Sequence, residues 1–214
     1  MTRVLLTGFA PFDGESTNPS WQAVRAAADA PPAGIEVSAV ELPCIYGASI
    51  AVLRAAIEET RPEIVVCVGQ AGGRPDITLE RVALNVDDAR IPDASGAEPI
   101  DEAIVPGGPA AYFSTLPIKA CVEAVRAAGL PASVSNTAGT FVCNHVFYGL
   151  AHLIATELPD VRGGFVHVPY TPEQVVDRAE PSLPADAAAR ALREIALTAA
   201  RTRTDIRVAG GATH

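Results

Sequence analysis

The stretch SNTAGTFVCNH, residues 135–145, runs from a polar turn that contains glycine directly into an amphipathic helix, and the rest of the chain is organised around it. Cys143 stands at this junction. Backbone N–H groups in the first turn of a helix lack intrahelical partners and the helix dipole is positive there, so a thiol at this position loses its proton more readily. The sequence therefore predicts that Cys143 is a reactive nucleophile.

The same alternation of strand and helix extends along the chain on both sides of this junction. Apolar or alternating runs predict strands at residues 3–8, 35–42, 63–68, 82–86, 132–135 and 163–168. Helical spacing predicts helices at residues 21–30, 49–60, 116–129, 140–158 and 185–202. Residues 87–109 are rich in acidic residues, proline and glycine, and we expect a long, partly exposed excursion there. With no linker or repeat, the pattern predicts a single three-layer α/β domain over residues 1–214.

The composition indicates an acidic globular protein. A length of 214 residues with 49% hydrophobic residues suffices for a substantial core, and the formal net charge of −9 argues against nucleic acid or an anionic membrane as a partner. The sequence has no apolar run of 18 residues and no secretory signal at its start, so we expect a cytoplasmic protein.

The cysteines and the short motifs limit the chemistry further. The cysteines form no C-x-x-C pair and no metal-ligand spacing, so we expect free thiols, no disulfide framework and no metal site. Motifs typical of zinc peptidases, serine hydrolases, P-loops and dinucleotide sites are absent, and no cofactor is expected. The four cysteines are Cys44, Cys67, Cys121 and Cys143.

Helix geometry selects a base for Cys143 among the four histidines. His145 lies about 200° and His152 about 180° around the helix from Cys143, so neither readily reaches the sulfur. His214 is the last residue, and we expect it to be disordered. His167 remains, at the carboxyl end of the strand that follows the Cys143 helix, which is the edge where α/β sites gather.

The acid that orients this histidine is less sharply defined. Residues 82–86 alternate with the period of a strand, and on that register Glu80 points to the same apolar side as Val82 and Leu84. Buried carboxylates are rare unless paired, and the carboxylate that orients a catalytic histidine is normally shielded, so Glu80 is favoured. Four other carboxylates stay open as alternatives: Asp76, Asp87, Asp88 and Asp93.

Two loops at the carboxyl ends of predicted strands are candidates for a pocket. The first carries Phe9 and Phe12, which either line a ligand site or pin the loop to the core. The second, residues 69–76, is rich in glycine and carries Gln70, and it either brings amide groups to a ligand or forms a plain turn.

Four motifs, taken together, resemble a known family. They are LLTGFAPFDGESTNPSW near the start, ERVALNVDDARIPD from Glu80, SNTAGTFVCNHVFYGL from Ser135, and GFVHVPYTPEQV from Gly164. In this order and spacing they are similar to the pyroglutamyl peptidase I family, also called the pyrrolidone-carboxylate peptidases.

This resemblance implies a fold, an activity and a set of site residues. The fold would be an α/β/α sandwich around a mixed, mostly parallel sheet. The activity would be removal of an N-terminal 5-oxoproline (pyroglutamyl) residue from peptides through a thioester, in the cytoplasm, by a homo-oligomer that is often a tetramer. The triad would be Cys143, His167 and Glu80.

A pyroglutamyl ring is small, neutral and largely apolar, so its pocket needs aromatic walls and a few amide contacts. By resemblance Phe9 and Phe12 are ring-binding residues. We expect polar contacts or pocket support from Asn18 and Gln70, help at the oxyanion from Arg90, and closure of the pocket by Val142.

Several positions depart from the family pattern: Ala10, Asp13, Cys44 and Ala94. Asp13 and Cys44 lie near the expected pocket and affect its shape. Two other functions stay open on the sequence: a non-catalytic module whose glycine-rich loops hold an anion such as a phosphate, and an enzyme like the nucleoside phosphorylases.

Overall fold

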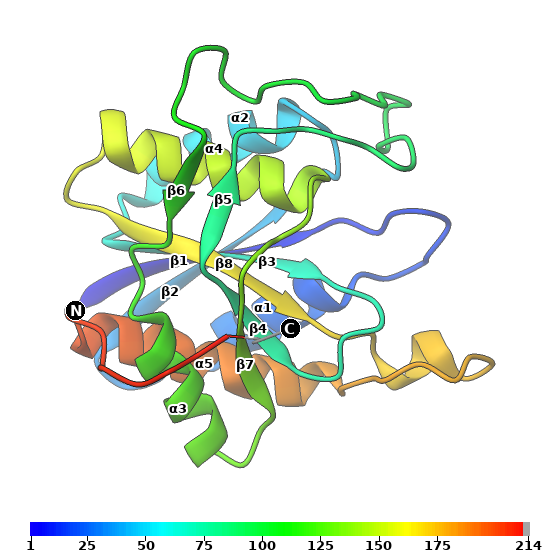
Figure 1. The fold of residues 1–214 in the computed structure, drawn as a ribbon. Helices are drawn as coiled ribbons and strands as arrows, with labels where there is room; N and C mark the ends of the chain where they lie inside the picture. The colour runs from blue at the N-terminus through cyan, green and yellow to red at the C-terminus, as the bar shows by residue number, and fades with distance from the viewer. Residues whose placement is uncertain (212–214) are drawn as a thin grey trace.

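The computed structural model describes residues 1–211, and its centre is a six-stranded sheet with helices on both faces (Figure 1). The strand order is β2-β1-β3-β8-β4-β7. All neighbouring strands are parallel except β4 and β8, which are antiparallel, so the predicted mixed, mostly parallel sheet is confirmed. The strands are β1 (Thr2–Phe9), β2 (Ile35–Leu42), β3 (Ile64–Gln70), β4 (Ile77–Glu80), β7 (Ala132–Ser135) and β8 (Arg162–Val168).

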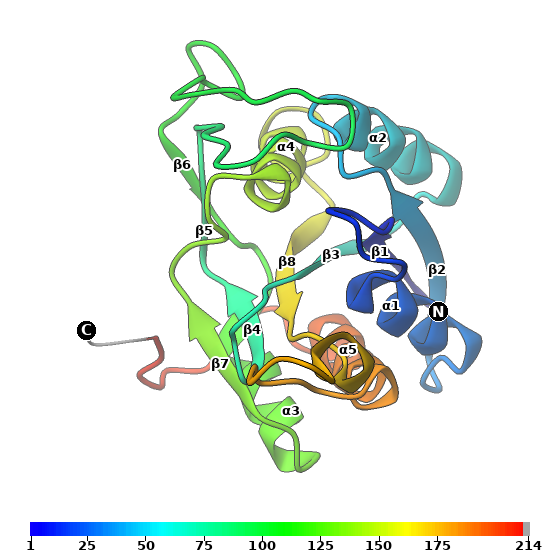
Figure 2. The ribbon, with the colours of Figure 1, turned by 90° about the vertical axis from the view of Figure 1, so that its right-hand side faces the viewer.

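The two faces of the sheet are covered by two groups of helices (Figure 2). Helices α1 (Pro19–Asp29), α3 (Ile118–Ala127) and α5 (Ala185–Arg201) lie on one face, and α2 (Ala48–Thr60) and α4 (Val142–Thr156) lie on the other. Successive side chains of a strand point to opposite faces, so β3 sends Val66 and Val68 into one apolar core and Val65 and Cys67 into the other. The predicted three-layer α/β architecture is confirmed.

The register that was used to place Glu80 is wrong in one respect. Glu80 ends β4 in the main sheet, whereas Val82 and Leu84 belong to β5 (Val82–Leu84), which pairs with β6 (Ala111–Phe113) in a separate two-stranded sheet. In β5 it is Ala83 that is buried, and its two neighbours are only half-buried. Glu80 is nevertheless fully buried, because β4 lies inside the main sheet between β8 and β7.

The long connection between β5 and β6 lies over the α2 and α4 layer (Figures 1 and 2). The predicted long, partly exposed excursion is confirmed: most of its residues are exposed, and a few side chains are anchored inward. Asp87 pairs with His145 of α4 at 2.8 Å, and Asp93 accepts a hydrogen bond from the backbone N–H of Tyr46 at 2.9 Å. Both carboxylates are buried, so this connection forms a wall of the molecule and not a free loop.

The segment between β8 and α5 contains a short 3₁₀ helix, Pro172–Val175. The expectation for His214 falls outside the described residues. Within residues 1–211 no helix is both long and apolar enough to cross a membrane.

Candidate active site

Cys143 is the second residue of α4, close to where the sequence places it. The residue before the helix is Phe141, and within the described part of the chain no side chain caps the first turn. The N–H groups of this turn are therefore free to meet a ligand oxygen. The sulfur lies tightly against β3: a Cβ atom on Gly69 would stand only 2.7 Å from Sγ of Cys143. Only glycine allows the thiol to approach this strand so closely.

His167 and Glu80 form a buried hydrogen-bonded pair. His167 is next to last in β8 and Glu80 ends β4, which runs antiparallel beside it. Nδ1 of His167 lies 2.7 Å from Oε1 of Glu80, and the two residues are 3% and 0% exposed. Because Nδ1 is engaged by the carboxylate, Nε2 is the nitrogen left to exchange a proton.

The sheet register brings Cys143 and His167 to the same place. Gly69 of β3 pairs with His167 of β8, and Gly69 is also the residue against which the sulfur of Cys143 rests. The phenyl ring of Phe165, two residues before His167, lies beside the imidazole, with ring centroids 4.9 Å apart. Its Cζ atom would lie 3.0 Å from the same Cβ on Gly69 that the sulfur of Cys143 would crowd. The structure thus gathers the three residues named from the sequence at the carboxyl end of β3 and β8.

The protonation states follow from burial and from nearby charges. Burial lowers the pKa of His167 below its ordinary value, although the Glu80 carboxylate opposes this, so the imidazole is neutral at pH 7. Burial acts to raise the pKa of Glu80, but its hydrogen bond to His167 and the cation of Arg74 outweigh burial, and the pKa is lowered. Glu80 is therefore an ionised carboxylate that accepts from a neutral histidine.

Cys143 differs from the expectation that its helix position makes it acidic. Burial raises the pKa of the thiol above its ordinary value, Glu80 adds to the rise, and Arg74 opposes it. The thiol therefore keeps its proton until a base removes it. A neutral imidazole with a free Nε2 is the group suited to that task.

The other histidines are occupied elsewhere, as helix geometry predicts. Nδ1 of His145 lies 2.8 Å from Oδ2 of Asp87, and its Nε2 accepts the backbone N–H of Gly47 at 2.9 Å. Nδ1 of His152 lies 3.0 Å from the hydroxyl of Tyr112. Asp87 is thus the partner of a different histidine, and Glu80 is the carboxylate that contacts His167.

The remaining acidic alternatives do not pair with a histidine within residues 1–211. Asp93 is buried but accepts hydrogen bonds from Tyr46, Ser95 and Ala97. Asp88 is exposed at the rim of the cavity described below, and Asp76 is half-buried in the turn before β4.

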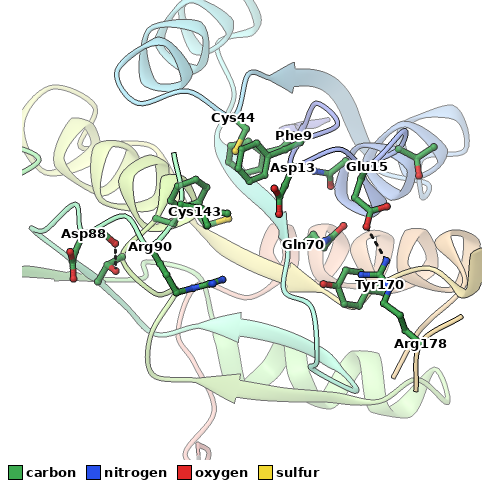
Figure 3. A pocket seen from close by; sticks show the side chains of 16 residues that line it. Phe9, Asp13, Glu15, Cys44, Gln70, Asp88, Arg90, Cys143, Tyr170 and Arg178 are labelled. Atoms are coloured by element: carbon green, nitrogen blue, oxygen red, sulfur yellow. Dashed lines mark hydrogen bonds and ion pairs between the residues drawn. The ribbon is translucent and has the colours of Figure 1, made fainter. Parts of the chain in front are cut away.

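A cavity of about 500 Å³ opens in front of Cys143 (Figure 3). Phe9, which is 2% exposed, and Phe12 contribute aromatic walls, and Phe141 packs on Phe12 with ring centroids 5.4 Å apart. Charged residues form the rim, where Arg178 pairs with Glu15 at 2.9 Å. The full lining is Phe9, Phe12, Asp13, Glu15, Thr17, Asn18, Cys44, Gln70, Asp88, Arg90, Ile91, Thr140, Phe141, Cys143, Tyr170 and Arg178.

The other predicted pocket residues have different positions. Gln70 and Arg90 line the cavity, and the Arg90 side chain points into it (Figure 3). Asn18 also lines it, but its side chain bonds to the Ala10 carbonyl and to Ser20, so it supports the loop that carries the aromatic rings. Val142 is fully buried in the apolar core and is not one of the lining residues, so the expectation that its side chain closes the pocket is wrong. Phe141, its neighbour, lies at the cavity instead.

Sequence reasoning missed several residues at this site, among them Phe141, described above, and three others. Arg74 contacts Glu80, and Tyr170 and Arg178 line the cavity from the segment after β8. Arg74 lies in the glycine-rich loop at residues 69–76. Its positive charge, close to Glu80 in the sequence, was the signal that could have identified it as a partner of that carboxylate. Tyr170 and Arg178 had no such signal, because they lie between the strand predicted at residues 163–168 and the helix predicted at residues 185–202.

Residues 2–202 match the family model described as pyroglutamyl peptidase. The match covers nearly the whole chain and includes the segments that carry Cys143, His167 and Glu80. This chain belongs to the pyroglutamyl peptidase family. The resemblance inferred from four motifs is confirmed.

Relatives in the pyroglutamyl peptidase family match along their full length. The pyrrolidone-carboxylate peptidase of Streptomyces coelicolor is 63% identical, and that of Escherichia fergusonii is 57% identical, with 100% of both chains covered in each case. A crystal structure titled pyroglutamyl peptidase I from Bacillus amyloliquefaciens has a TM-score of 0.95 at 50% identity and covers 96% of this chain and 100% of that chain. The pyrrolidone carboxyl peptidase of Thermococcus litoralis has a TM-score of 0.92 at 36% identity, with 98% and 100% covered.

Proposed function

We propose that this protein is a cysteine exopeptidase that removes an N-terminal pyroglutamyl residue from peptides, with Cys143 as nucleophile, His167 as base and acid, and Glu80 as the group that orients His167. Family membership carries the activity. The observation that carries the residue roles is the buried 2.7 Å contact between His167 and Glu80, next to the strand position against which the Cys143 sulfur rests.

The reaction begins with transfer of the Cys143 proton to Nε2 of His167, after which the sulfur attacks the carbonyl that joins the pyroglutamyl ring to the next residue. His167 then gives its proton to the leaving amine, and the peptide departs from a thioester. In the second half, His167 takes a proton from water, whose oxygen attacks the thioester carbonyl; the C–S bond breaks, pyroglutamate is released, and His167 returns the proton to the sulfur of Cys143. Glu80 stays ionised and stabilises the imidazolium in both halves.

The oxyanion that forms in each half can be held by the first turn of α4. The N–H groups of this turn point toward the cavity end of the helix, and the dipole adds a partial positive charge. Arg90 lines the same cavity and supplies a full positive charge nearby. Removal of one such donor typically costs on the order of 10²-fold in rate.

The cavity suits a neutral lactam ring better than a charged terminus. The aromatic walls of Phe9, Phe12 and Phe141 match the apolar body of the ring, and Gln70 offers an amide to its polar edge. The cavity volume of about 500 Å³ exceeds what one ring fills, which leaves room for the next residue of the peptide beside the charged rim. We propose that residues 1–214 act as one peptidase domain.

The alternatives left open by the sequence are not favoured by any observation at this site. The free N–H groups of α4 suit any anionic oxygen, but a phosphate site also needs an excess of cations over carboxylates. The rim instead carries three carboxylates, Asp13, Glu15 and Asp88, and one of its two arginines is already paired.

The location and assembly of the protein are also part of the proposal. The four cysteines are free thiols, which suits a reducing cytoplasm. By family resemblance we propose a homo-oligomer, with a tetramer expected. Phe113 on β6, which is 70% exposed, offers an apolar surface that a second copy can cover, and sedimentation analysis would measure the assembly.

A chromogenic pyroglutamyl amide tests the activity and the nucleophile together. The wild type should release the chromophore, Cys143→Ala should lose at least about 10³-fold in kcat, and the matched variant Cys121→Ala, in the opposite core, should keep its activity. No turnover by the wild type would refute the activity. Turnover by Cys143→Ala would refute the nucleophile.

A further inference from the structure

Arg74 lies in the loop between β3 and β4, and its guanidinium contacts three groups around the Glu80 carboxylate. Nη1 donates to Oε1 of Glu80 at 2.6 Å and to Oγ1 of Thr78 at 2.7 Å. Nη2 donates to the backbone carbonyl of Thr137 at 3.1 Å. The Arg74 side chain is 29% exposed and that of Glu80 is 0% exposed, so a half-buried cation touches a fully buried carboxylate.

The contact is to the same oxygen that serves His167. Oε1 of Glu80 accepts from Nδ1 of His167 at 2.7 Å and from Arg74 at 2.6 Å, so the carboxylate is held from two sides. An ionised hydrogen bond of this kind is short and strong, and a planar guanidinium fixes direction as well as distance. The orientation of Glu80 therefore depends on both partners.

The three contacts of Arg74 also join the segments that carry the triad. Thr78 pairs with His167 across β4 and β8. Thr137 belongs to the turn that leads from β7 into α4, and hence to Cys143. A single side chain thus links the strand of Glu80, the neighbour of His167 and the approach to the nucleophile.

On the basis of the triad roles proposed above, we propose that Arg74 is a positioning residue for this reaction. It holds the Glu80 carboxylate at hydrogen-bonding distance from His167, and its positive charge keeps the exchange of a proton between Cys143 and His167 possible near neutral pH.

The sign of the charge effect follows from the surroundings of the pair. Arg74 lowers the pKa of Cys143 and of His167, and it lowers that of Glu80. A positive charge makes every neighbouring proton easier to lose. Its removal therefore moves both limbs of the pH profile of kcat/KM, the rise on the acidic side and the fall on the alkaline side, to higher pH. The titratable and charged groups around the pair come from several elements: Glu80 from β4, Arg74 from the β3–β4 loop, Cys67 from β3, Cys44 and Tyr46 from the segment after β2, Arg90 from the β5–β6 connection, and Cys143 and His167 themselves.

A purely structural role would give a different result. An arginine that only pins the β3–β4 loop would affect the free energy of unfolding, and its loss would leave the pH limbs of the folded enzyme in place. The pH profile of kcat/KM and the split between kcat and KM therefore separate positioning from simple support.

The first experiment compares Arg74→Met, Arg74→Lys and Arg54→Met on a pyroglutamyl amide. Arg54→Met is the matched control, since Arg54 forms a 2.6 Å ion pair with Glu157 on the surface. We expect Arg74→Met to lower kcat on the order of 10- to 100-fold, to change KM by less than about threefold, and to move both limbs to higher pH. Arg74→Lys keeps the positive charge but not the planar guanidinium. It should have both limbs at their wild-type pH and only part of the wild-type kcat. Arg54→Met should match the wild type.

Two results would overturn the proposal while the peptidase function stands. One is an active wild type with Arg74→Met unchanged in kcat and in both limbs. The other is an equal loss of kcat in Arg74→Met and Arg74→Lys with no movement of the limbs in either. An inactive wild type would instead refute the proposed function.

The double variant Arg74→Met with Glu80→Gln keeps the test valid if Arg74→Met alone does not fold, because it leaves neither buried charge without its partner. Glu80→Gln alone should move both limbs to lower pH, and the double variant should bring them back toward the wild-type positions. If the double variant has the same limbs as Glu80→Gln alone, Arg74 exerts no charge effect and the proposal fails.

Discussion

Nδ1 of His167 lies 2.7 Å from Oε1 of Glu80, although 87 positions of sequence separate the two residues. The contact forms because β4 runs antiparallel to β8 inside an otherwise parallel sheet, with Thr78 opposite His167 and Glu80 two residues further along. Both side chains are almost entirely shielded from solvent. The energetic consequences of this pair can be measured directly.

For Glu80→Gln we expect a smaller loss of kcat than for His167→Ala, because the glutamine still occupies the site whereas alanine removes the proton carrier. Burial holds the pKa of His167 low and the Glu80 carboxylate opposes that effect, so loss of the charge lowers the pKa of His167 further. The same charge raises the pKa of Cys143, so both limbs of kcat/KM should move to lower pH.

Profiles of kcat/KM between about pH 4 and pH 10, which bracket the ordinary histidine and cysteine ranges, measure this shift. Glu157→Gln, which removes an exposed carboxylate far from the triad, is the control. A loss as large as that of His167→Ala would mean that Glu80 does more than orient the imidazole. Limbs that move to higher pH would contradict the electrostatic assignment.

Gly69→Ala should disable the nucleophile by crowding it. The new Cβ would stand 2.7 Å from Sγ of Cys143 and 3.0 Å from Cζ of Phe165, so the sulfur must move away from its place beside His167. We expect a loss of kcat on the order of 10²-fold and a loss of about 1–3 kcal/mol in the free energy of unfolding.

Gly163→Ala is the matched control for Gly69→Ala. Its Cβ would also be crowded, at 2.9 Å from Cδ2 of Leu150, but at the other end of the sheet from the thiol. It should lose a similar amount of stability in urea denaturation and keep kcat near the wild-type value. Equal losses of kcat in both variants would show that crowding acts through general loosening of the sheet.

His145→Asn should affect stability and not the chemistry. The side chain joins Asp87, which is 6% exposed, to the backbone N–H of Gly47, and its loss leaves a buried carboxylate without this partner. We expect the free energy of unfolding to fall by about 2–3 kcal/mol, while kcat of the folded enzyme changes by less than about tenfold.

His167→Asn provides the comparison, with an expected loss of kcat on the order of 10²–10⁴-fold. Both variants are assayed well below the midpoint of thermal unfolding, so that folded protein is compared with folded protein. Loss of turnover in His145→Asn under these conditions would revive His145 as a catalytic group.

Asp13 has a left-handed backbone, with a φ of 54°, at the rim of the cavity. This conformation favours glycine. Asp13→Gly should therefore be more stable than Asp13→Ala by about 1 kcal/mol in chemical denaturation. Equal stabilities would show that the side chain of Asp13 fully compensates the backbone conformation. Retention of KM in Asp13→Gly would show that its carboxylate does not contact substrate.

The elements with strong local patterns were predictable from the sequence. The strand at residues 132–135 and the start of α5 at Ala185 were placed correctly, and α4 was placed within two residues at each end, because periodic apolar residues and turn residues act over short distances. The strand predicted at residues 82–86 corresponds to β5, which begins at Val82, but β4 and the three-residue strand β6 were not predicted. Three residues carry too little periodicity, and the break after Glu80 depends on which partner strand lies beside it.

At the site, the residues proposed as nucleophile, base and acid were located from the sequence, but for unequal reasons. Cys143 has a local signal in its helix position, and His167 followed from the angles around that helix. Glu80 was selected with a register that the structure corrects. Arg74 and the buried position of Val142 were not foreseen, because contacts across the sheet and the direction of a side chain at a helix start are not encoded in spacing.

The sequence by itself determined the alternation of strands and helices, the family and the identity of the reactive thiol, since each depends on short-range pattern or on motifs. Only the tertiary structure decided how that thiol is activated. Cys143 was expected to be acidic because of its helix terminus, yet burial raises the pKa of its thiol above the ordinary value. Strand pairing brings the base, the ionised Glu80 and the cation of Arg74 to this thiol. The burial of the thiol and the charge around it depend on neighbours that the order of the sequence does not specify.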